Sequence, residues 1–138
     1  MIGGNKVDYA FRYVIPGCCA GKKNNMSIAV NQKTGRWFIT QSKRYKDYEK
    51  AAGWYLHPIP DKPIDYPVNV RCIFYFPDMR TRDALNCQEA IDDILQKYKI
   101  LADDKWSIVA GHDGSRCYID RGNPRTEIYI EPVELEGW

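Results

Sequence analysis

The sequence predicts a single α+β domain, spanning residues 1–138, in which two main helices pack on a mixed β-sheet. Three observations support this. Residues 68–76 alternate between apolar and other side chains, as a half-buried strand does. Residues 83–99 carry apolar side chains at helical spacing. A chain of 138 residues with 44% hydrophobic residues is long enough to bury one core.

The first sixty residues are expected to form three strands and one helix. Alternating apolar residues predict a strand over 7–15, with Tyr9, Phe11, Tyr13 and Ile15 on one face, before Pro16 and Gly17 end it. Short strands over 27–30 and 36–40 flank a turn-like Gln-Lys-Thr-Gly segment. Ser42 is placed to cap a helix that runs to about residue 56.

The rest of the chain is expected to alternate between strand and helix before it ends in strands. Pro77 stops the strand over 68–76. The helix over 83–99 has a buried stripe made of Cys87, Ile91, Ile94, Leu95 and Tyr98. Strands are then predicted over 106–110, 116–120 and 126–130, with a turn at 111–114.

Composition limits the classes of function. The five cysteines are odd in number and none has C-x-x-C spacing, which argues against a disulfide framework or structural zinc and favours reduced thiols in the cytoplasm. We expect no secretory signal and no membrane span, because no apolar run is long enough. The net charge of +2 is small, but lysines and arginines crowd the first half of the chain and acids the second. That asymmetry is consistent with a basic surface beside an acidic site, or with two ordinary solvated faces.

One stretch has the residue types of a metal-dependent site. A strand ends at Pro77-Asp78, a basic loop follows, Asp83 and Asn86 open a helix, and Asp103-Asp104 come after it. Carboxylates in these places can converge on a hard cation such as Mg²⁺, which binds oxygen ligands. The pattern alone leaves two alternatives open: Asp83 can be a helix cap, and Asp103-Asp104 can be a solvated turn.

The same stretch resembles the RusA family of Holliday-junction resolvases. The family has a strand ending in Pro-Asp, a basic loop, Asp-x-Asp-Asn-x-x-Lys at a helix start, and a later Asp-Asp. The matching residues here are Pro77-Asp78, Arg82-Asp83, Asn86, Gln88, Ala90, Leu95 and Asp103-Asp104. Ile15-Pro16-Gly17 with Lys22, Lys23 and Asn24, and the last strand over 126–130, also look like family segments.

The resemblance implies a dimeric endodeoxyribonuclease that cuts branched DNA with Mg²⁺ or Mn²⁺. Carried over by position, it implies Asp83 and Asp104 as catalytic acids, and Asp83, Asp103 and Asp104 as metal ligands. Leu85 replaces the family's second acid, and Glu89 replaces its lysine. Glu89 lies four residues after Leu85, on the same helix face, so it is a candidate to supply the missing catalytic carboxylate.

DNA contacts and partners are also expected from the resemblance. The candidate DNA-binding residues are Lys22, Lys23, Arg80, Arg82 and Asn86. The expected partners are a four-way DNA junction and a second copy of the chain, in a bacterial or phage-encoded cytoplasmic protein. Leu85 and Glu89 keep two alternatives open: a protein that binds branched DNA without cutting it, and a protein-interaction module on the same scaffold.

The remaining aromatic and histidine residues are assigned structural roles. Trp37, Phe38, Trp54 and Tyr55 are expected in the core or in dimer contacts, with base stacking as a lesser alternative. Trp106 is expected to pack beneath the acidic pair. His57 and His112 have no partner at metal-ligand spacing and are interpreted as structural.

Overall fold

The computed structural model describes residues 10–22, 26–41, 43–80 and 82–137. Its strands and helices, in chain order, are β1 (Phe11–Pro16), β2 (Met26–Val30), β3 (Trp37–Gln41), α1 (Lys43–Ala52), β4 (Val68–Phe76), α2 (Ala84–Lys97), β5 (Val109–Gly111), β6 (Arg116–Ile119) and β7 (Arg125–Pro132). The arrangement is the α+β fold that the sequence predicts.

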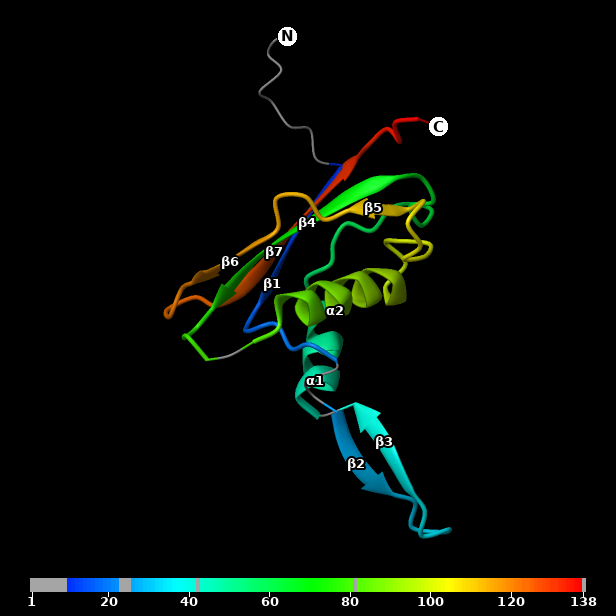
Figure 1. Ribbon diagram of the computed structural model, residues 1–138, viewed down its shortest axis with the longest axis vertical. Helices are drawn as coiled ribbons and strands as arrows, with labels where there is room; N and C mark the ends of the chain where they lie inside the picture. Colours follow the sequence, from blue (N-terminus) through cyan, green and yellow to red (C-terminus); the bar gives the residue numbers. More distant parts are fainter. Residues whose placement is uncertain (1–9, 23–25, 42, 81, 138) are drawn as a thin grey trace.

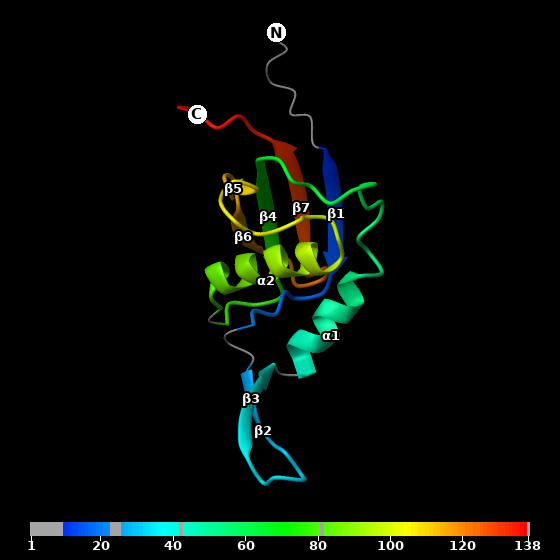
Figure 2. The same ribbon diagram turned by 90° about the vertical axis from the view of Figure 1, so that its right-hand side faces the viewer.

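The main sheet is mixed and has the strand order β1-β7-β4-β5. Strand β7 is antiparallel to both of its neighbours, β1 and β4. Strands β5 and β6 both run parallel to β4 and share one of its edges, with β5 beside the start of β4 and β6 beside its end. Both helices lie on one face of this sheet (Figure 2).

The core lies between that face and helix α2. The expected stripe of α2 is confirmed, since Ile91, Ile94 and Leu95 are fully buried, Cys87 is buried and Tyr98 packs partly against the core. They share one core with side chains from strands β1, β4 and β7, namely Tyr13, Ile15, Val70, Cys72, Phe74, Ile128 and Ile130. Burial of each large apolar side chain contributes about 1.5–3 kcal/mol, which fixes the position of α2 over the sheet.

Strands β2 and β3 form a separate two-stranded hairpin that stands away from the main sheet (Figures 1 and 2). The register pairs Ile28 with Ile39 and Val30 with Trp37. Opposite residues, and residues two apart, share one face of a hairpin. These four apolar side chains therefore form one face, and all of them are exposed. We call them the hairpin apolar face.

Three expectations about local structure need correction. The segment 106–108 is a turn, and the strand begins only at Val109. Trp106 is 70% exposed and is not packed beneath the acidic pair. Trp37, Phe38, Trp54 and Tyr55 are exposed as well, so none of them belongs to the core. The expected cap at Ser42 and the expected start of the first strand at 7–9 lie outside the described residues.

None of the helices in the described ranges is long and apolar enough to cross a membrane.

Candidate functional site

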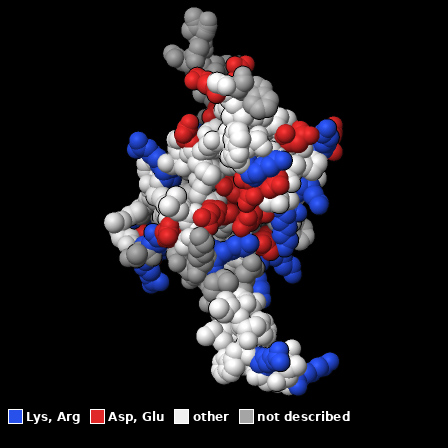
Figure 3. Space-filling model, turned by 45° about the vertical axis from the view of Figure 1, so that its right-hand side comes forward, with Lys and Arg blue, Asp and Glu red and all other residues white. Residues whose placement is uncertain are grey.

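Acidic side chains gather around a pocket of about 450 Å³ beside helix α2. Figure 3 shows this face of the molecule, with a cluster of Asp and Glu bordered by Lys and Arg. The residues that line the pocket are Glu89, Asp92, Asp93, Asp104, Trp106, Val109 and His112. We call it the acidic pocket.

Local geometry explains why these acids meet. Glu89, Asp92 and Asp93 are three and four residues apart on α2, so they project from one face of the helix. Helix α2 ends at Lys97, and the chain turns back through Lys99, which adopts a left-handed φ of 67°. The returning loop brings Asp104 to the same pocket, and strand β5 brings Val109.

Asp92 and His112 form a pair at the base of the pocket. His112 Nε2 lies 2.7 Å from Asp92 Oδ2. Burial raises the pKa of Asp92, and the hydrogen bond to Asp92 raises the pKa of His112. Asp92 Oδ1 is buried and, among the described residues, has no hydrogen-bond partner. The pocket wall thus contains one buried carboxylate oxygen to which no described residue donates a hydrogen bond.

The Asp92–His112 pair makes stability depend on pH. A histidine whose pKa is raised by folding stabilises the protein below its unfolded pKa, near 6.5, and this contribution is lost as pH rises through the folded pKa. We expect His112→Ala to lower the free energy of unfolding by about 1 kcal/mol near pH 6 and by less near pH 9. The value is smaller than for a fully buried pair, because the ring is partly exposed. Urea denaturation of both proteins at the two pH values measures this. An equal cost at both would contradict it.

Asp104 is exposed, but its charge is disfavoured. Partial burial raises its pKa, followed by the hydrogen bond with Asp103 and repulsion from Asp93. Asp103 Oδ1 accepts a 2.7 Å hydrogen bond from the backbone N–H of Asp104 and so shapes the loop. Asp103 itself does not line the pocket. Of the expected Asp103-Asp104 pair, the structure brings Asp104 to the other acids.

Asp83 caps helix α2. Its Oδ1 accepts hydrogen bonds from the backbone N–H groups of Leu85 and Asn86, at 2.9 and 3.2 Å. Its backbone is extended, as an N-cap requires. Asp83 is not among the residues that line the acidic pocket. The helix-cap alternative therefore describes its observed contacts.

Two substitutions of Asp83 distinguish its role as a helix cap from a role that needs its charge. Asp83→Ala should lower the free energy of unfolding by about 1 kcal/mol, because two backbone N–H groups lose their acceptor. Asp83→Asn should leave it nearly unchanged, because asparagine caps equally well. Chemical denaturation of the two variants measures this. If both variants lose stability equally, the carboxylate charge matters and not its capping geometry.

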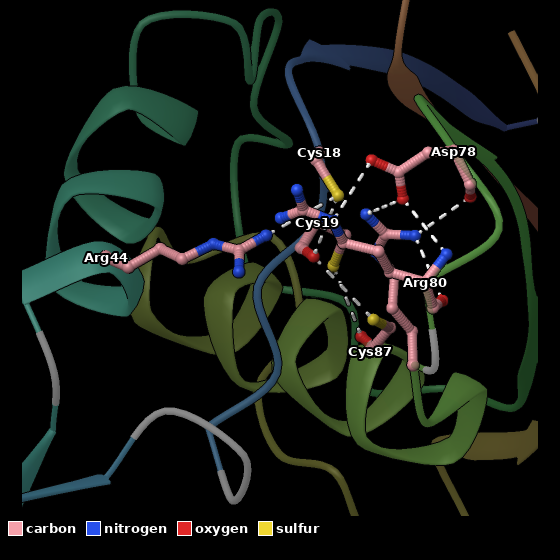
Figure 4. Close-up of polar contacts among 7 residues, drawn as sticks. Cys18, Cys19, Arg44, Asp78, Arg80 and Cys87 are labelled. Carbon is pink, nitrogen blue, oxygen red and sulfur yellow. Dashed lines mark hydrogen bonds and ion pairs between the residues drawn. The ribbon is translucent and has the colours of Figure 1, made fainter. Parts of the chain in front are cut away.

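The two arginines of the loop before α2, Arg80 and Arg82, differ in burial. Arg82 is largely buried, forms a 2.8 Å ion pair with Asp78 and donates to the carbonyls of Asp78 and Arg80. The Arg80 backbone N–H, followed by the Arg82 guanidinium, lowers the pKa of Asp78. The Arg80 guanidinium is highly exposed and 3.7 Å from Asp78 (Figure 4). Arg82 thus stabilises the loop, whereas Arg80 presents its charge to solvent.

Two other expected DNA contacts are engaged within the fold. Lys22 Nζ lies 3.0 Å from Asp93 Oδ2 and 5.7 Å from the centre of the Tyr45 ring. Asn86 is only 7% exposed. It lies against Gly21, where an added Cβ would come within 2.8 Å of the Asn86 Cβ. Lys23 lies outside the described residues.

The donor set fits a hard divalent cation that is shared with a substrate. Among the described residues, no three His, Cys, Asp or Glu side chains are arranged to hold a metal ion by themselves. Mg²⁺, however, is usually held by one or two carboxylates with water and substrate phosphate completing its shell. The clustered carboxylates of Glu89, Asp93 and Asp104, with the buried Asp92 oxygen that no described residue contacts by a hydrogen bond, provide oxygen ligands of this kind.

Asp92 and His112 line the acidic pocket, but the sequence analysis did not select Asp92 and assigned His112 a structural role. Asp92 could have been found, because it lies three residues after Glu89 and shares its helix face. His112 follows a turn and a short strand, and nothing in its local sequence indicates a partner 20 residues earlier.

Comparison with known proteins shows the family to which the chain belongs. The family model described as "Endodeoxyribonuclease RusA" matches residues 19–131, which is most of the chain. A search of curated proteins finds no match.

Proposed function

Because the chain belongs to the RusA endodeoxyribonuclease family, we propose that it is a divalent-metal-dependent endonuclease that cuts four-way DNA junctions. The observation that carries the proposal is the convergence of Asp104 with Glu89 in the acidic pocket. Asp104 matches the family's later catalytic acid, and Glu89 is the candidate replacement for the acid that is lost at Leu85.

In this proposal the residues of the acidic pocket have different roles. Asp104 and Glu89 would hold the cation, Mg²⁺ or Mn²⁺. When bound, such an ion neutralises charge on the scissile phosphate and activates water. Asp92 would be held in place at the pocket wall by its hydrogen bond with His112. The family resemblance alone supports Asp83 as a catalytic acid and metal ligand and Asp103 as a metal ligand, and both stay candidates.

DNA would be held mainly through its phosphates. Arg80 is exposed and lies in the loop that leads into α2, and from Gly17 to Lys46 the sequence has seven Lys and Arg and no acid. Phosphate contacts release counterions, so binding should weaken steeply between low and physiological salt. Lys22 would have to exchange Asp93 for phosphate, and Asn86 would have to become accessible.

We also propose that two copies pair through the hairpin apolar face. Two-stranded hairpins are marginally stable alone, and this one exposes 69% of Ile28 and 73% of Trp37. The face has no charged residue, so it can pack against itself around a two-fold axis. Such a dimer would offer two equivalent sites to the two equivalent strands of a junction.

Charge on that face should break the dimer. Ile39→Asp is expected to shift the sedimentation mass from dimer to monomer at micromolar concentration, because pairing would bury an unpaired carboxylate. Thr40→Asp is the matched control, since Thr40 occupies the other face, where Lys46 donates to its hydroxyl. A wild-type protein that sediments as a monomer, with and without junction DNA, would exclude the homodimer.

The proposed function is tested by incubating the purified protein with a labelled four-way junction and with duplex of the same sequence, with and without Mg²⁺. We expect cleavage of the junction only, and only with the metal. Binding without cleavage under all conditions would favour the non-catalytic junction-binding alternative. The absence of both would leave the interaction-module alternative.

A further inference from the structure

A second pocket adjoins the acidic pocket and differs from it in character. It has a volume of about 590 Å³. Its wall consists mostly of apolar side chains, and the residues that line it are Pro67, Trp106, Ser107, Val133, Glu134 and Leu135. We call it the apolar pocket. Trp106 lines both pockets, so any group in the apolar pocket lies one side chain away from the carboxylates.

The apolar pocket is built by three chain segments held together by backbone hydrogen bonds. The N–H of Val133 donates to the carbonyl of Pro67 at 3.1 Å, and the N–H of Val68 donates to the carbonyl of Ile108 at 2.8 Å. The turn that carries Trp106 is closed by hydrogen bonds from Ile108 and Val109 to Lys105. The pocket is therefore present before any ligand arrives, as ligand sites usually are.

Trp106 presents an exposed aromatic ring at the edge of the apolar pocket. Its side chain is 70% exposed, although a large apolar pocket lies beside it. An exposed indole beside a phosphate-binding site is suited to stacking on a planar ring that is attached to the phosphate. Ser107 and Glu134 add oxygen acceptors at the wall, which can accept hydrogen bonds from exocyclic amino groups.

We propose that the apolar pocket binds one unstacked nucleobase of the DNA, stacked on Trp106, while a neighbouring phosphate lies at the acidic pocket. This inference rests on the proposed function. Bases beside a strand exchange are more easily unstacked than bases within a duplex, because they lack a continuous stack. Base–aromatic stacking tolerates any base sequence, so the pocket recognises the distorted branch and not a sequence.

The test uses the full-length protein and junctions that carry 2-aminopurine at successive positions next to the branch. Binding is measured without divalent cation, so that the DNA stays intact. We expect at least one position to change its fluorescence when wild-type protein saturates the junction, and to lose that change with Trp106→Ala. Trp106→Ala should also bind about ten-fold more weakly, whereas Trp106→Phe should recover most of this loss because it keeps an aromatic face.

Trp54→Ala is the matched control, because Trp54 is equally exposed but lies just after α1 and lines neither pocket. It should behave as wild type. If wild type binds and cuts junctions while Trp106→Ala binds equally well and no probe position responds, the inference is overturned and the proposed function stands. If Trp106→Ala instead changes the sedimentation mass and no probe responds, the pocket holds a second copy of the chain. If the wild-type protein does not bind junctions, both this inference and the proposed function are overturned.

Discussion

Asp104→Asn should reduce junction cleavage by about a thousand-fold while leaving junction binding intact. The substitution keeps the side-chain volume and removes one of the two carboxylates proposed to hold the cation. A bound metal contributes several kcal/mol to transition-state stabilisation, and each 1.36 kcal/mol is a factor of ten in rate. Because burial, and after it the hydrogen bond with Asp103 and repulsion from Asp93, raise the pKa of Asp104, the neutral variant should be no less stable. Single-turnover cleavage at saturating protein and Mg²⁺ measures the loss.

Asp103→Asn is the matched control for that experiment. The asparagine keeps an oxygen that can accept the backbone N–H of Asp104, so the loop should hold its shape. Because Asp103 does not line the acidic pocket, cleavage should stay within a few-fold of wild type. Equal and large losses in both variants would mean that Asp103 also acts at the metal, as the family resemblance implies.

Glu89→Gln should reduce cleavage by about a hundred-fold, because it removes the other carboxylate proposed to hold the cation. The more informative protein is the double variant Glu89→Gln with Leu85→Asp. Leu85 is 75% exposed, so an aspartate there costs little stability. It restores an acid one helical turn earlier on the same face, at the position where the family has one. We expect the double variant to recover most of the lost cleavage.

Leu85→Asn in the same background is the control for that rescue, because it changes polarity and shape without adding charge. Recovery with asparagine as well would indicate that removal of the leucine, and not the new carboxylate, restores cleavage. If Glu89→Gln cuts as well as wild type, Glu89 has not replaced the family acid. Measuring the Mg²⁺ concentration that gives half-maximal cleavage separates weaker metal binding from slower chemistry.

Much of the fold could be predicted from periodicity. The bounds of the strand over 68–76 and the buried stripe of α2 were predicted correctly from their periods. The strand is more buried than the expected half-buried one, because Asn69 and Ile73 on its other face are buried too. The strand expected from Trp106 starts three residues later, at Val109, because local hydrogen bonds to Lys105 close a turn there. The core alternative for Trp37 and Phe38 was wrong, since no local pattern shows that a strand pair leaves the main sheet, and the dimer-contact alternative stays a proposal.

The site was predicted less completely. The acids near Asp83 and Asp104 were found from motif order, but order does not say which acids converge. A 14-residue helix separates the two ends of the motif, and the pocket forms where the loop meets the middle of α2, at Glu89 and Asp92. The pairing of Asp92 with His112 depends on a contact between helix and sheet that only the tertiary structure defines.

The place of β7 in the sheet has a consequence for synthesis of the protein. Strand β7 lies between β1 and β4, and it pairs Phe11 with Ile130 and Val68 with Pro132. The strand that joins the two halves of the sheet is therefore translated last. Until residues 125–132 have left the ribosome, β1 and β4 have no partner between them, and their apolar side chains stay available to chaperones or to other nascent chains. A ribosome that stalls before Arg125 should hold a chain in which β1 has no strand beside it, although β5 and β6 can already pair with β4.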